Sequence, residues 1–526
     1  MLLYLISKPY LTPKLIVKPL PINLLLIIYK MTQQNIWYTF LQRAKLPLEL
    51  AGLSIAAILL LKDVGQLIKT IIPEIPKINS TIGEKTMFPS GKISSEKKLG
   101  MEEFNNKRFS SAIYQFRKSL NRDKNDPETV IFLNNAIAKQ TKILNQTGEI
   151  LQIAVSIPAA GEPNIAQEIL RGVAQLQSEF NCGLSEISLA IKDTQSQLNC
   201  QGSSNNTFLQ VTITDDRYKP ETAKQIAEYL VKKREILAVI GHYSSEMTLQ
   251  AGQVYNKHKL VVISPTSTST RLSNFGKFVF KIPPSDQIAA QTLFNYLNQE
   301  IFLDKNVAVA YVPNNEYSES LTREFEMLLK MKKFVHKCYL DAGNFSAQDC
   351  VEQAKNQGAE VMLLVPATDI TLTKAIGVID NAKGLELIGG DSIYNYRVVN
   401  DAGEEAAQNN LTVAIPWHRH PNSQFSQTAQ KFWNAEINWR TATSYDATQT
   451  IIKAVDEMAG NYSRQKLQRI LSSPDFLVEG VTGKIRFTEL GDRQFLDTDK
   501  SVLVKVKPNA KSGKYEFIIL EEGSSK

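Results

Sequence analysis

Hydroxyl side chains gather in two places between Val239 and Leu272 of this 526-residue chain. Ser244 and Ser245 follow the apolar segment AVIG, and an unbroken run of serines and threonines at 266–270 follows LVVISP. Hydroxyl groups and the N–H groups at helix N-termini can hold an anion without burying a full countercharge. Helix capping explains one hydroxyl per helix. Five in succession exceed that need, so the pattern predicts that these residues belong to a binding site.

Apolar segments of strand length alternate with helical patterns after Gly148. Parallel sheets with helices on both faces produce this alternation, because their strands are buried on both sides. Ligands of such sheets bind beyond the carboxyl ends of the strands. Both clusters of serines and threonines follow directly after predicted strands, so they fall in this position. The predicted fold class is therefore α/β. Strands are expected at 150–158, 208–216, 236–241, 260–265, 306–312, 359–366 and 385–391, and helices at 166–180 and 220–234.

Composition is that of a globular protein with several domains: 43% of the residues are hydrophobic and 21% are charged. The formal net charge of +7 is spread over 60 basic and 53 acidic residues. The chain has no basic blocks interleaved with aromatic residues, which would mark a nucleic-acid surface. We therefore expect no nucleic-acid partner.

Two apolar runs within residues 1–72 predict a membrane anchor. The first, at 20–29, follows several lysines, and the second, at 48–61, is about 14 residues long, short of the roughly 20 that span a bilayer. A short signal-anchor and a buried or interfacial helix both fit. We favour the anchor, with the remainder of the chain across the membrane. Either Met1 or Met31 can serve as the start, and cleavage of the segment stays open.

Residues 73–98 are rich in proline, serine, glycine and lysine and keep no apolar period, so they predict a linker. Residues 99–145 predict a helical pair. Apolar residues at 109–120 recur at intervals of three and four, and Pro127 suits the first turn of a second helix.

The helical pair resembles a tetratricopeptide repeat. Gly100, Phe109, Ala112 and Phe116 have the spacing that this repeat uses for close helix packing, although Ser119 replaces a small alanine. One repeat cannot bury its own apolar face. The pair is therefore expected to pack on the following domain or on a partner, and a plain helical hairpin fits the pattern equally.

Residues 149–526 resemble the type I periplasmic solute-binding proteins of ABC transporters, particularly the branched-chain amino acid binding group. The resemblance implies two α/β lobes joined by a hinge that the chain crosses three times. Lobe 1 would take about 150–284 and 415–495, and lobe 2 about 285–414 and 496–526. The blocks that carry the resemblance are, in order, ILRGVAQ, VTITDDRYKPETAKQIAEYLV, AVIGHYSSEMT, VVISPTST, PNNEYSES, GAEVMLLVP, LIGGDSIYN, TATSYDATQTIIKAV and GVTGKIRFTELGDR.

The resemblance gives the hydroxyl cluster a ligand, the carboxylate of an amino acid. Ser245 and Thr268 match family positions that donate hydrogen bonds to that carboxylate. Thr266 matches a position whose backbone carbonyl accepts from the ligand ammonium, and Ser267 is expected to contribute its backbone N–H. Helix capping is the alternative role for these hydroxyls.

Two further residues of the second lobe match the family pattern. Asp391 falls where the family places an acidic residue facing the ligand ammonium, usually a glutamate, and an aspartate that opens a turn is the alternative. Tyr317 matches a tyrosine that closes over the ligand. Tyr243, Glu246 and Tyr394 lie close in sequence to the expected site, but they leave the ligand's side chain undecided.

The sequence predicts a binding protein and no enzyme. The serines lack a GxSxG context, no phosphate-binding glycine motif opens a helix, and His418 and His420 lack a third metal ligand nearby. We expect no cofactor and no metal. The expected partners are a small-molecule ligand, an ABC permease and, through residues 1–72, the membrane. The alternative is a ligand-binding sensor or scaffold whose helical pair recruits a signalling partner.

Four cysteines form two local pairs, Cys182 with Cys200 and Cys338 with Cys350. An even number in local pairs suits disulfides in an oxidising compartment, and reduced buried cysteines are the alternative. Together with the anchor, the disulfides predict a protein held at the inner membrane and facing the periplasm.

Overall fold

Parallel strands form most of the two large sheets in the computed structural model of this protein. The structure describes residues 78–88, 93–145, 148–203, 206–299, 305–329, 333–495, 501–510 and 512–520, all within the unit 78–526. These residues include no helix that is long and apolar enough to cross a membrane. The two apolar runs predicted as an anchor, and part of the predicted linker, lie outside the described residues.

We call lobe 1 the part of the chain that is built on the sheet with the strand order β1-β3-β2-β4-β5-β6. β1 is antiparallel to β3, and the other neighbours are parallel. Successive side chains enter opposite faces, so Ile153 and Val155 of β2 join one apolar core and Ala154 joins another. The strands are β1 (Ser80–Thr81), β2 (Ile150–Ile157), β3 (Phe208–Asp215), β4 (Ile236–Ile240), β5 (Val261–Ser264) and β6 (Val279–Lys281).

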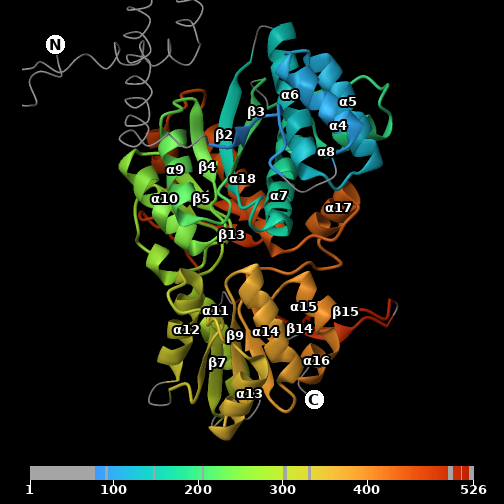
Figure 1. The fold of residues 1–526 in the computed structure, drawn as a ribbon. Helices are drawn as coiled ribbons and strands as arrows, with labels where there is room; N and C mark the ends of the chain where they lie inside the picture. Colours follow the sequence, from blue (N-terminus) through green and yellow to red (C-terminus); the bar gives the residue numbers. More distant parts are fainter. Residues whose placement is uncertain are drawn as a thin grey trace, which may run out of the picture. The chain divides into compact units, whose positions relative to one another are not determined.

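Helices cover both faces of this sheet (Figure 1). The helices α7, α17, α18 and α19 supply the core that contains Ile153, whereas α9 and α10 supply the core that contains Ala154. Lobe 1 therefore combines two distant segments of the chain. The helices are α7 (Pro163–Asn181), α8 (Leu184–Lys192), α9 (Pro220–Val231), α10 (Ser245–Lys257), α17 (Gln424–Trp433), α18 (Trp439–Asp456) and α19 (Arg464–Leu471).

Gly172 lets α7 and α18 approach closely. A Cβ atom at this position would lie 2.3 Å from the carbonyl oxygen of Thr441 and 2.5 Å from the backbone nitrogen of Tyr445. No side chain fits there, because both neighbouring atoms belong to the backbone of α18. The N-terminal part of α18 is thereby held against α7.

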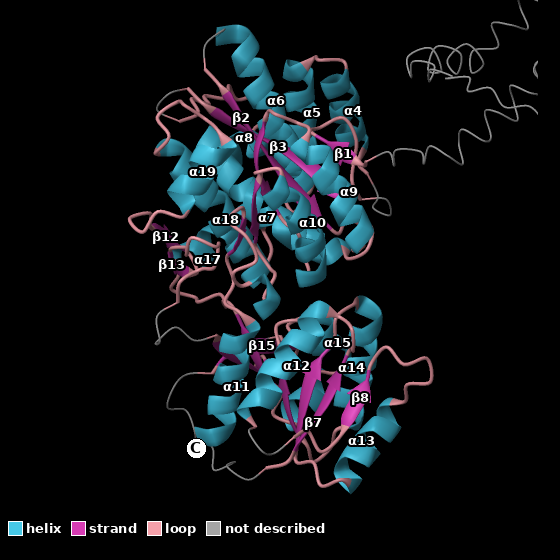
Figure 2. Cartoon of the chain, turned by 90° about the vertical axis from the view of Figure 1, so that its left-hand side faces the viewer, coloured by secondary structure: helices cyan, strands magenta, loops and turns pink. Residues whose placement is uncertain are grey.

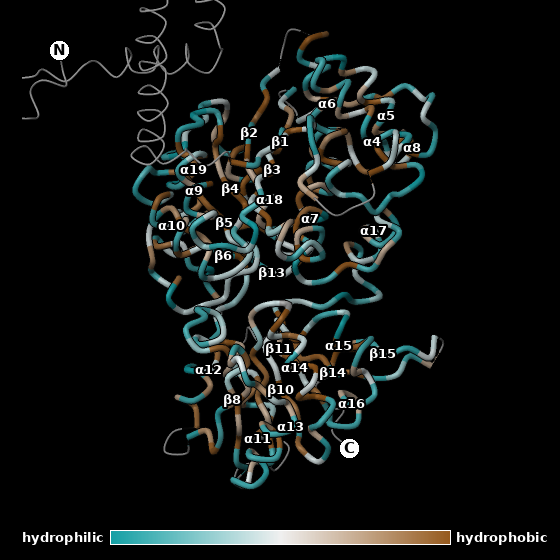
Figure 3. Tube along the Cα trace, viewed as in Figure 1, coloured by the Kyte–Doolittle hydropathy of each residue, from teal (hydrophilic) through white to brown (hydrophobic). Residues whose placement is uncertain are grey.

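Lobe 2 is built on a sheet with the strand order β15-β14-β11-β10-β9-β7-β8, in which β14 and β15 are antiparallel to their neighbours. The strands of both sheets are largely hydrophobic (Figure 3). The strands are β7 (Val307–Tyr311), β8 (Lys337–Tyr339), β9 (Val361–Val365), β10 (Glu386–Gly389), β11 (Thr412–Ile415), β14 (Val502–Pro508) and β15 (Tyr515–Ile519). The helices are α11 (Asp286–Gln299), α12 (Glu316–Leu328), α13 (Ala347–Asn356), α14 (Asp369–Asn381), α15 (Tyr396–Asp401) and α16 (Gly403–Gln408).

The chain passes between the lobes at three places. It leaves lobe 1 after β6 and returns between β11 and α17. It passes to lobe 2 again between residues 495 and 501, after the short hairpin of β12 (Val478–Gly480) and β13 (Gly483–Ile485).

Residues 95–145 form three helices, not the predicted pair that begins at residue 99. They are α4 (Ser95–Asn105), α5 (Phe109–Arg122) and α6 (Pro127–Asn145). The start of α4 has no apolar stripe and depends on its cap, Ser94, whose side chain accepts from the N–H of Lys97. A Cβ atom at Gly100 would lie 2.5 Å from the ring of Phe116, so α4 and α5 are closely packed.

The helical segment packs on lobe 1, beside β1 and β3 (Figure 2). The Asn135 side chain of α6 accepts from the N–H of Val211 in β3 at 2.9 Å and donates to the carbonyl of the same residue at 2.8 Å. Arg117 of α5 donates to the carbonyl of Ala190 in α8 at 2.8 Å. Of the two expected surfaces, the following domain is therefore the one that covers this segment.

Residues 78–88 fold onto the same lobe, although the sequence assigns them to a linker. Thr81 of β1 pairs with Ile213, and Met87 is buried and donates its N–H to Glu128 at 2.6 Å. A strand of two residues is too short to show an apolar period, which explains why the composition indicates a linker.

Candidate ligand-binding site

A cavity of about 30 Å³ lies between the two lobes, beyond the carboxyl ends of β4 and β5. It brings together every residue predicted for the site except Ser267. Its walls also contain residues that the sequence analysis did not select. The lining residues are Tyr218, Tyr243, Ser244, Ser245, Thr266, Thr268, Tyr317, Ala367, Asp391, Ser392 and Trp439.

Ser245 is the first residue of α10 and is only 1% exposed. Its Oγ accepts hydrogen bonds from the backbone N–H groups of Thr268, at 3.3 Å, and Ser269, at 3.1 Å. These bonds occupy the acceptor capacity of the hydroxyl, so its own proton stays available for another acceptor. Ser245 can therefore donate to a ligand that enters the cavity.

Thr268 lines the same cavity from the loop after β5. Its hydroxyl is buried and makes no hydrogen bond of ordinary geometry among the described residues, although it lies beside the Asp286 carboxyl and lowers the pKa of that group. Buried hydroxyl groups are normally paired, so a poorly satisfied one beside a cavity indicates a partner that enters from outside. Ser245 and Thr268 together form a pair of donors suited to one carboxylate.

The neighbouring hydroxyls are engaged inside lobe 1. The carbonyl of His242 accepts hydrogen bonds from the side chains of Thr248 at 3.2 Å, Ser264 at 3.0 Å and Ser267 at 3.4 Å. The N–H of Ser267, expected to serve the ligand, donates instead to Ser264 at 3.0 Å. The hydroxyl of Thr266 donates to the carbonyl of Tyr243 at 2.6 Å.

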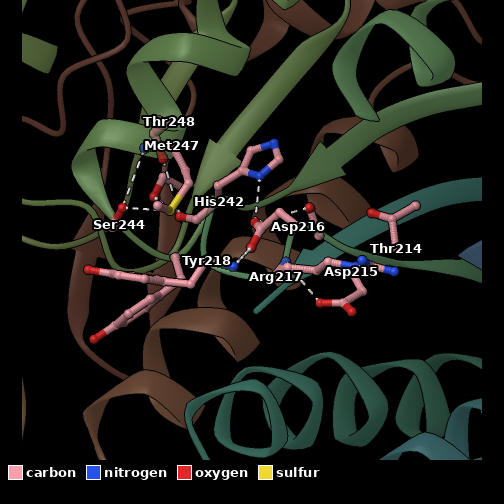
Figure 4. Close-up of polar contacts among 12 residues, drawn as sticks. Thr214, Asp215, Asp216, Arg217, Tyr218, His242, Ser244, Met247 and Thr248 are labelled. Carbon is pink, nitrogen blue, oxygen red and sulfur yellow. Dashed lines mark hydrogen bonds and ion pairs between the residues drawn. The ribbon is translucent and has the colours of Figure 1, made fainter. Parts of the chain in front are cut away.

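His242 also ties together two loops that carry cavity residues (Figure 4). Its Nδ1 lies 2.8 Å from the Asp216 carboxylate, and both side chains are fully buried. The same carboxylate accepts from the N–H of Tyr218 at 3.1 Å, and the other ring nitrogen of His242 lies 3.2 Å from the hydroxyl of Tyr255. The network fixes the backbone on either side of the cavity wall.

Ser269 and Thr270 contact lobe 2. The hydroxyl of Ser269 donates to Glu316 at 2.6 Å, and the N–H of Thr270 donates to Ser320 at 3.1 Å, both in α12. Arg271 forms an ion pair with Glu316. The run of five hydroxyl residues therefore serves three purposes: loop structure, the cavity and the contact between lobes.

Asp391 supplies the acidic group of the cavity from the loop after β10. Burial raises the pKa of its carboxyl to about 6, against the opposing effect of the Arg440 guanidinium. Asp286 is a second buried acid nearby. Burial raises the pKa of Asp286 to about 7, against the opposing effect of the Ser320 and Thr268 hydroxyls. One of its carboxylate oxygens has no hydrogen-bond partner of ordinary geometry in the described structure.

Aromatic rings form much of the remaining wall. Tyr317 of α12 donates its hydroxyl to the side chain of Ser392 at 3.2 Å. The rings of Tyr218 and Tyr243 lie 5.7 Å apart between centroids. Neither Tyr218 nor Trp439 is predicted for the site from the sequence. The rule of strand ends could have found Tyr218, just past β3, but no local signal marks Trp439 in α18.

Glu246 and Tyr394, which lie close to the site in sequence, do not line the cavity. The Tyr394 hydroxyl instead lies 3.0 Å from Nδ1 of His418. Both cysteine pairs are bonded, Cys182 with Cys200 and Cys338 with Cys350. No group of His, Cys, Asp and Glu in the described part of the chain could hold a metal ion.

Two lobes with mainly parallel sheets, repeated chain crossings and a cavity between the lobes, lined by hydroxyl, acidic and aromatic side chains, define the class of two-lobed α/β binding proteins. The chain belongs to the periplasmic binding protein family, whose model matches residues 185–512, more than half of the chain.

Relatives and solved structures agree with this family. The "Leu/Ile/Val-binding protein homolog 1" of Brucella melitensis is 24% identical over 378 residues, which cover 70% of this chain and 92% of the relative. An ABC transporter substrate-binding protein of Desulfitobacterium hafniense in complex with Leu has a TM-score of 0.52 and 22% identity, covering 70% of this chain and 100% of that one. A solute-binding protein of Rhodopseudomonas palustris in complex with p-hydroxybenzoic acid has a TM-score of 0.57 and 14% identity, with 71% and 96% covered. At these identities the structures show the fold.

Proposed function

We propose that this chain is the extracytoplasmic solute-binding component of an ABC importer and that it binds an amino acid or a similar small zwitterion. The observation that carries the proposal is that two hydroxyl groups, those of Ser245 and Thr268, line one cavity together with the acidic Asp391. Leucine and p-hydroxybenzoic acid, the ligands of two structural neighbours, share a carboxylate. Only an amino acid adds the ammonium that Asp391 suits.

In this proposal the ligand carboxylate accepts hydrogen bonds from Ser245 and Thr268. The ammonium binds Asp391 and the backbone carbonyl of Thr266, and Tyr317 closes the cavity from lobe 2. Ser267 supports the loop, as its bonded N–H indicates. The ligand would be captured by closure of the lobes about the hinge, with contacts such as Ser269–Glu316 forming in the closed state.

We further propose that residues 1–72 hold the protein at the inner membrane and that the lobes face the periplasm. The apolar runs of that segment support the anchor, and the two disulfides support an oxidising compartment. An ABC permease is the expected partner. The sensor or scaffold alternative is less favoured, because the helical segment that would recruit a partner packs on lobe 1. The likeness of this segment to a tetratricopeptide repeat stays a proposal.

Calorimetric titration of the full chain with the standard amino acids and p-hydroxybenzoate tests this function. We expect an amino acid to bind and Ser245→Ala and Asp391→Ala each to weaken binding by about 10- to 100-fold. Ser423→Ala, which removes the hydroxyl cap of α17 away from the cavity, is the matched control and should keep the affinity. Absence of binding by every amino acid would refute the proposal, and full affinity in both site variants would refute the site.

A further inference from the structure

The loop that follows β5 connects the candidate site to lobe 2. At the site, the hydroxyl of Ser245 accepts hydrogen bonds from the N–H groups of Thr268, at 3.3 Å, and Ser269, at 3.1 Å. The residues that follow form the short helix Thr270–Leu272, which is hydrogen-bonded to α12 of lobe 2. One loop therefore contacts both the cavity and the opposite lobe.

Three side chains of α12 contact this loop. Glu316, Ser320 and Glu324 are spaced by four residues, so they lie on one side of the helix. Ser320 accepts from the N–H of Thr270 at 3.1 Å, and Glu324 accepts from the hydroxyl of Thr270, also at 3.1 Å. The side of α12 that meets lobe 1 is thus a row of hydrogen-bond acceptors.

Glu316 makes the shortest of these contacts. Its carboxylate accepts from the hydroxyl of Ser269 at 2.6 Å and forms an ion pair with Arg271. Ser269 is fully buried and the side chain of Glu316 is 10% exposed, so water competes little for the bond between them. This bond is charge-assisted, which makes it stronger than a bond between neutral groups. The Arg271 side chain is 65% exposed, so its ion pair contributes less.

The position of Glu316 in the sequence joins this contact to the cavity. The next residue of α12, Tyr317, lines the cavity from lobe 2, and Ser269 directly follows the proposed carboxylate donor Thr268. The bond between Glu316 and Ser269 therefore fixes two cavity walls, one on each lobe, relative to each other. Separation of the lobes would break the bond.

We propose that Glu316 is a positioning residue that couples occupation of the cavity to closure of the lobes. The inference rests on the proposed function, because it assumes that a ligand enters this cavity. Glu316 is not among the residues that line the cavity. It acts through the loop: a ligand that accepts from Ser245 and Thr268 orders the loop, and the ordered loop presents the hydroxyl of Ser269 to Glu316. The bond then keeps the lobes closed and slows the release of the ligand.

A purely structural role is the competing explanation. The same helix carries an ion pair within lobe 2, between Glu326 and Lys337 at 2.9 Å. A contact of that kind stabilises the fold whether the lobes are open or closed. Rate measurements separate the two roles, because a contact made on closure changes the dissociation rate constant and leaves the association rate constant nearly unchanged.

The first test is stopped-flow fluorescence of the full chain with the standard amino acids. For each amino acid that binds, we expect Glu316→Gln to raise the dissociation rate constant about tenfold and to change the association rate constant by less than about twofold. Ser269→Ala should give the same increase, and the double variant should add little, because both changes remove one bond. Glu326→Gln removes the same charge from the same helix and is the control, which should keep both rate constants.

The second test needs no ligand. Spin labels at Glu228→Cys in α9 and Glu352→Cys in α13, two exposed positions, report the distance between the lobes by double electron–electron resonance. The four native cysteines are bonded in disulfides and take no label. We expect Glu316→Gln to increase the share of a second distance, and Glu326→Gln to leave the distribution as in the parent.

The possible results lead to different conclusions. A dissociation rate constant that Glu316→Gln leaves unchanged overturns the coupling to the ligand, and an unchanged distance distribution overturns the role in closure. Faster dissociation of one amino acid alone, among several that bind, would make Glu316 a selectivity residue and overturn the positioning role. Absence of binding by every amino acid overturns the proposed function, and the label distances then decide separately whether Glu316 holds the lobes closed.

Discussion

Thr268 offers a test at the scale of one hydroxyl group. Its Oγ1 is buried and makes no hydrogen bond of ordinary geometry in the described structure, so Thr268→Val replaces a poorly satisfied polar atom by a methyl group of similar size. We predict that ligand affinity falls by about 10- to 100-fold, while the stability of the ligand-free protein stays equal or rises by up to about 1 kcal/mol. Calorimetric titration and thermal melts measure the two effects separately.

Thr248→Val is the matched control for that substitution. The Thr248 hydroxyl bonds to Ser267 at 2.8 Å and to the carbonyl of His242 at 3.2 Å, so its loss should lower stability by about 1–3 kcal/mol. If Thr268→Val lowers stability as much as Thr248→Val and leaves affinity unchanged, the hydroxyl of Thr268 is structural.

Asp391 links the site to the pH dependence of stability. Burial raises the pKa of its carboxyl to about 6, above the ordinary 3.8. Between about pH 4 and pH 6 the carboxyl is therefore protonated in the ligand-free folded protein and ionised in the unfolded chain. The contribution of Asp391 to stability decreases as the pH rises through this range. We predict that Asp391→Asn is more stable than the parent above pH 6, by about 1–2 kcal/mol, and equal to it near pH 4.

Denaturant titrations at pH 4 and pH 7.5 check this prediction. The stability gain should be accompanied by loss of ligand binding, because the amide no longer attracts an ammonium. A variant that is less stable than the parent at pH 7.5 would show that the Asp391 carboxylate is stabilised in the ligand-free protein, contrary to the raised pKa.

Residue types alone could not assign the hydroxyls their separate tasks. Within residues 266–270 the side chains look equivalent in the sequence, yet Ser267 bonds to its own loop, Thr268 lines the cavity and Ser269 contacts α12. The direction of each side chain depends on the turn after β5, which no periodicity describes. Trp439 was missed for a related reason, since its segment reaches the cavity only when α18 packs on α7.

At the scale of elements, the packing of α18 on α7 makes Gly172 sensitive. Gly172→Ala puts a Cβ atom 2.3 Å from the carbonyl oxygen of Thr441, so one helix must move. We predict a loss of about 2–4 kcal/mol in unfolding free energy, measured by denaturant titration. Gly343→Ala is the control, because a Cβ there meets no atom within 4 Å. Equal stability of the two variants would contradict the close approach.

The strands of the parallel sheets were the easiest elements to predict. Segments such as β4 and β9 are buried on both faces and appear as continuous apolar runs. β1 and the first turn of α4 were not predicted, because a two-residue strand and a polar helix start carry no period. The position of β1 depends on its pairing with β3, which is a tertiary interaction. The start of α4 depends on the Ser94 cap, which is a local hydrogen bond.

At the scale of the whole molecule, the helical segment and lobe 1 share one core. Phe116 and Phe132 of the helices belong to the same apolar cluster as Ile153 of β2 and Leu170 of α7. The Asn135 side chain bonds to both backbone groups of Val211 at the edge of the sheet. Removing the segment would expose this core and open the edge of β3, which favours aggregation.

We therefore predict that the family domain does not fold well by itself. A chain of residues 148–526 should aggregate, or melt more than about 10 °C below a chain of residues 78–526, because it exposes the apolar face that α6 covers. Circular dichroism melts and size-exclusion chromatography of the two chains compare them directly. Equal melting temperatures would mean that α4, α5 and α6 only rest on lobe 1 and are free to act as a separate recruiting module. A large difference would mean that they are part of the binding domain.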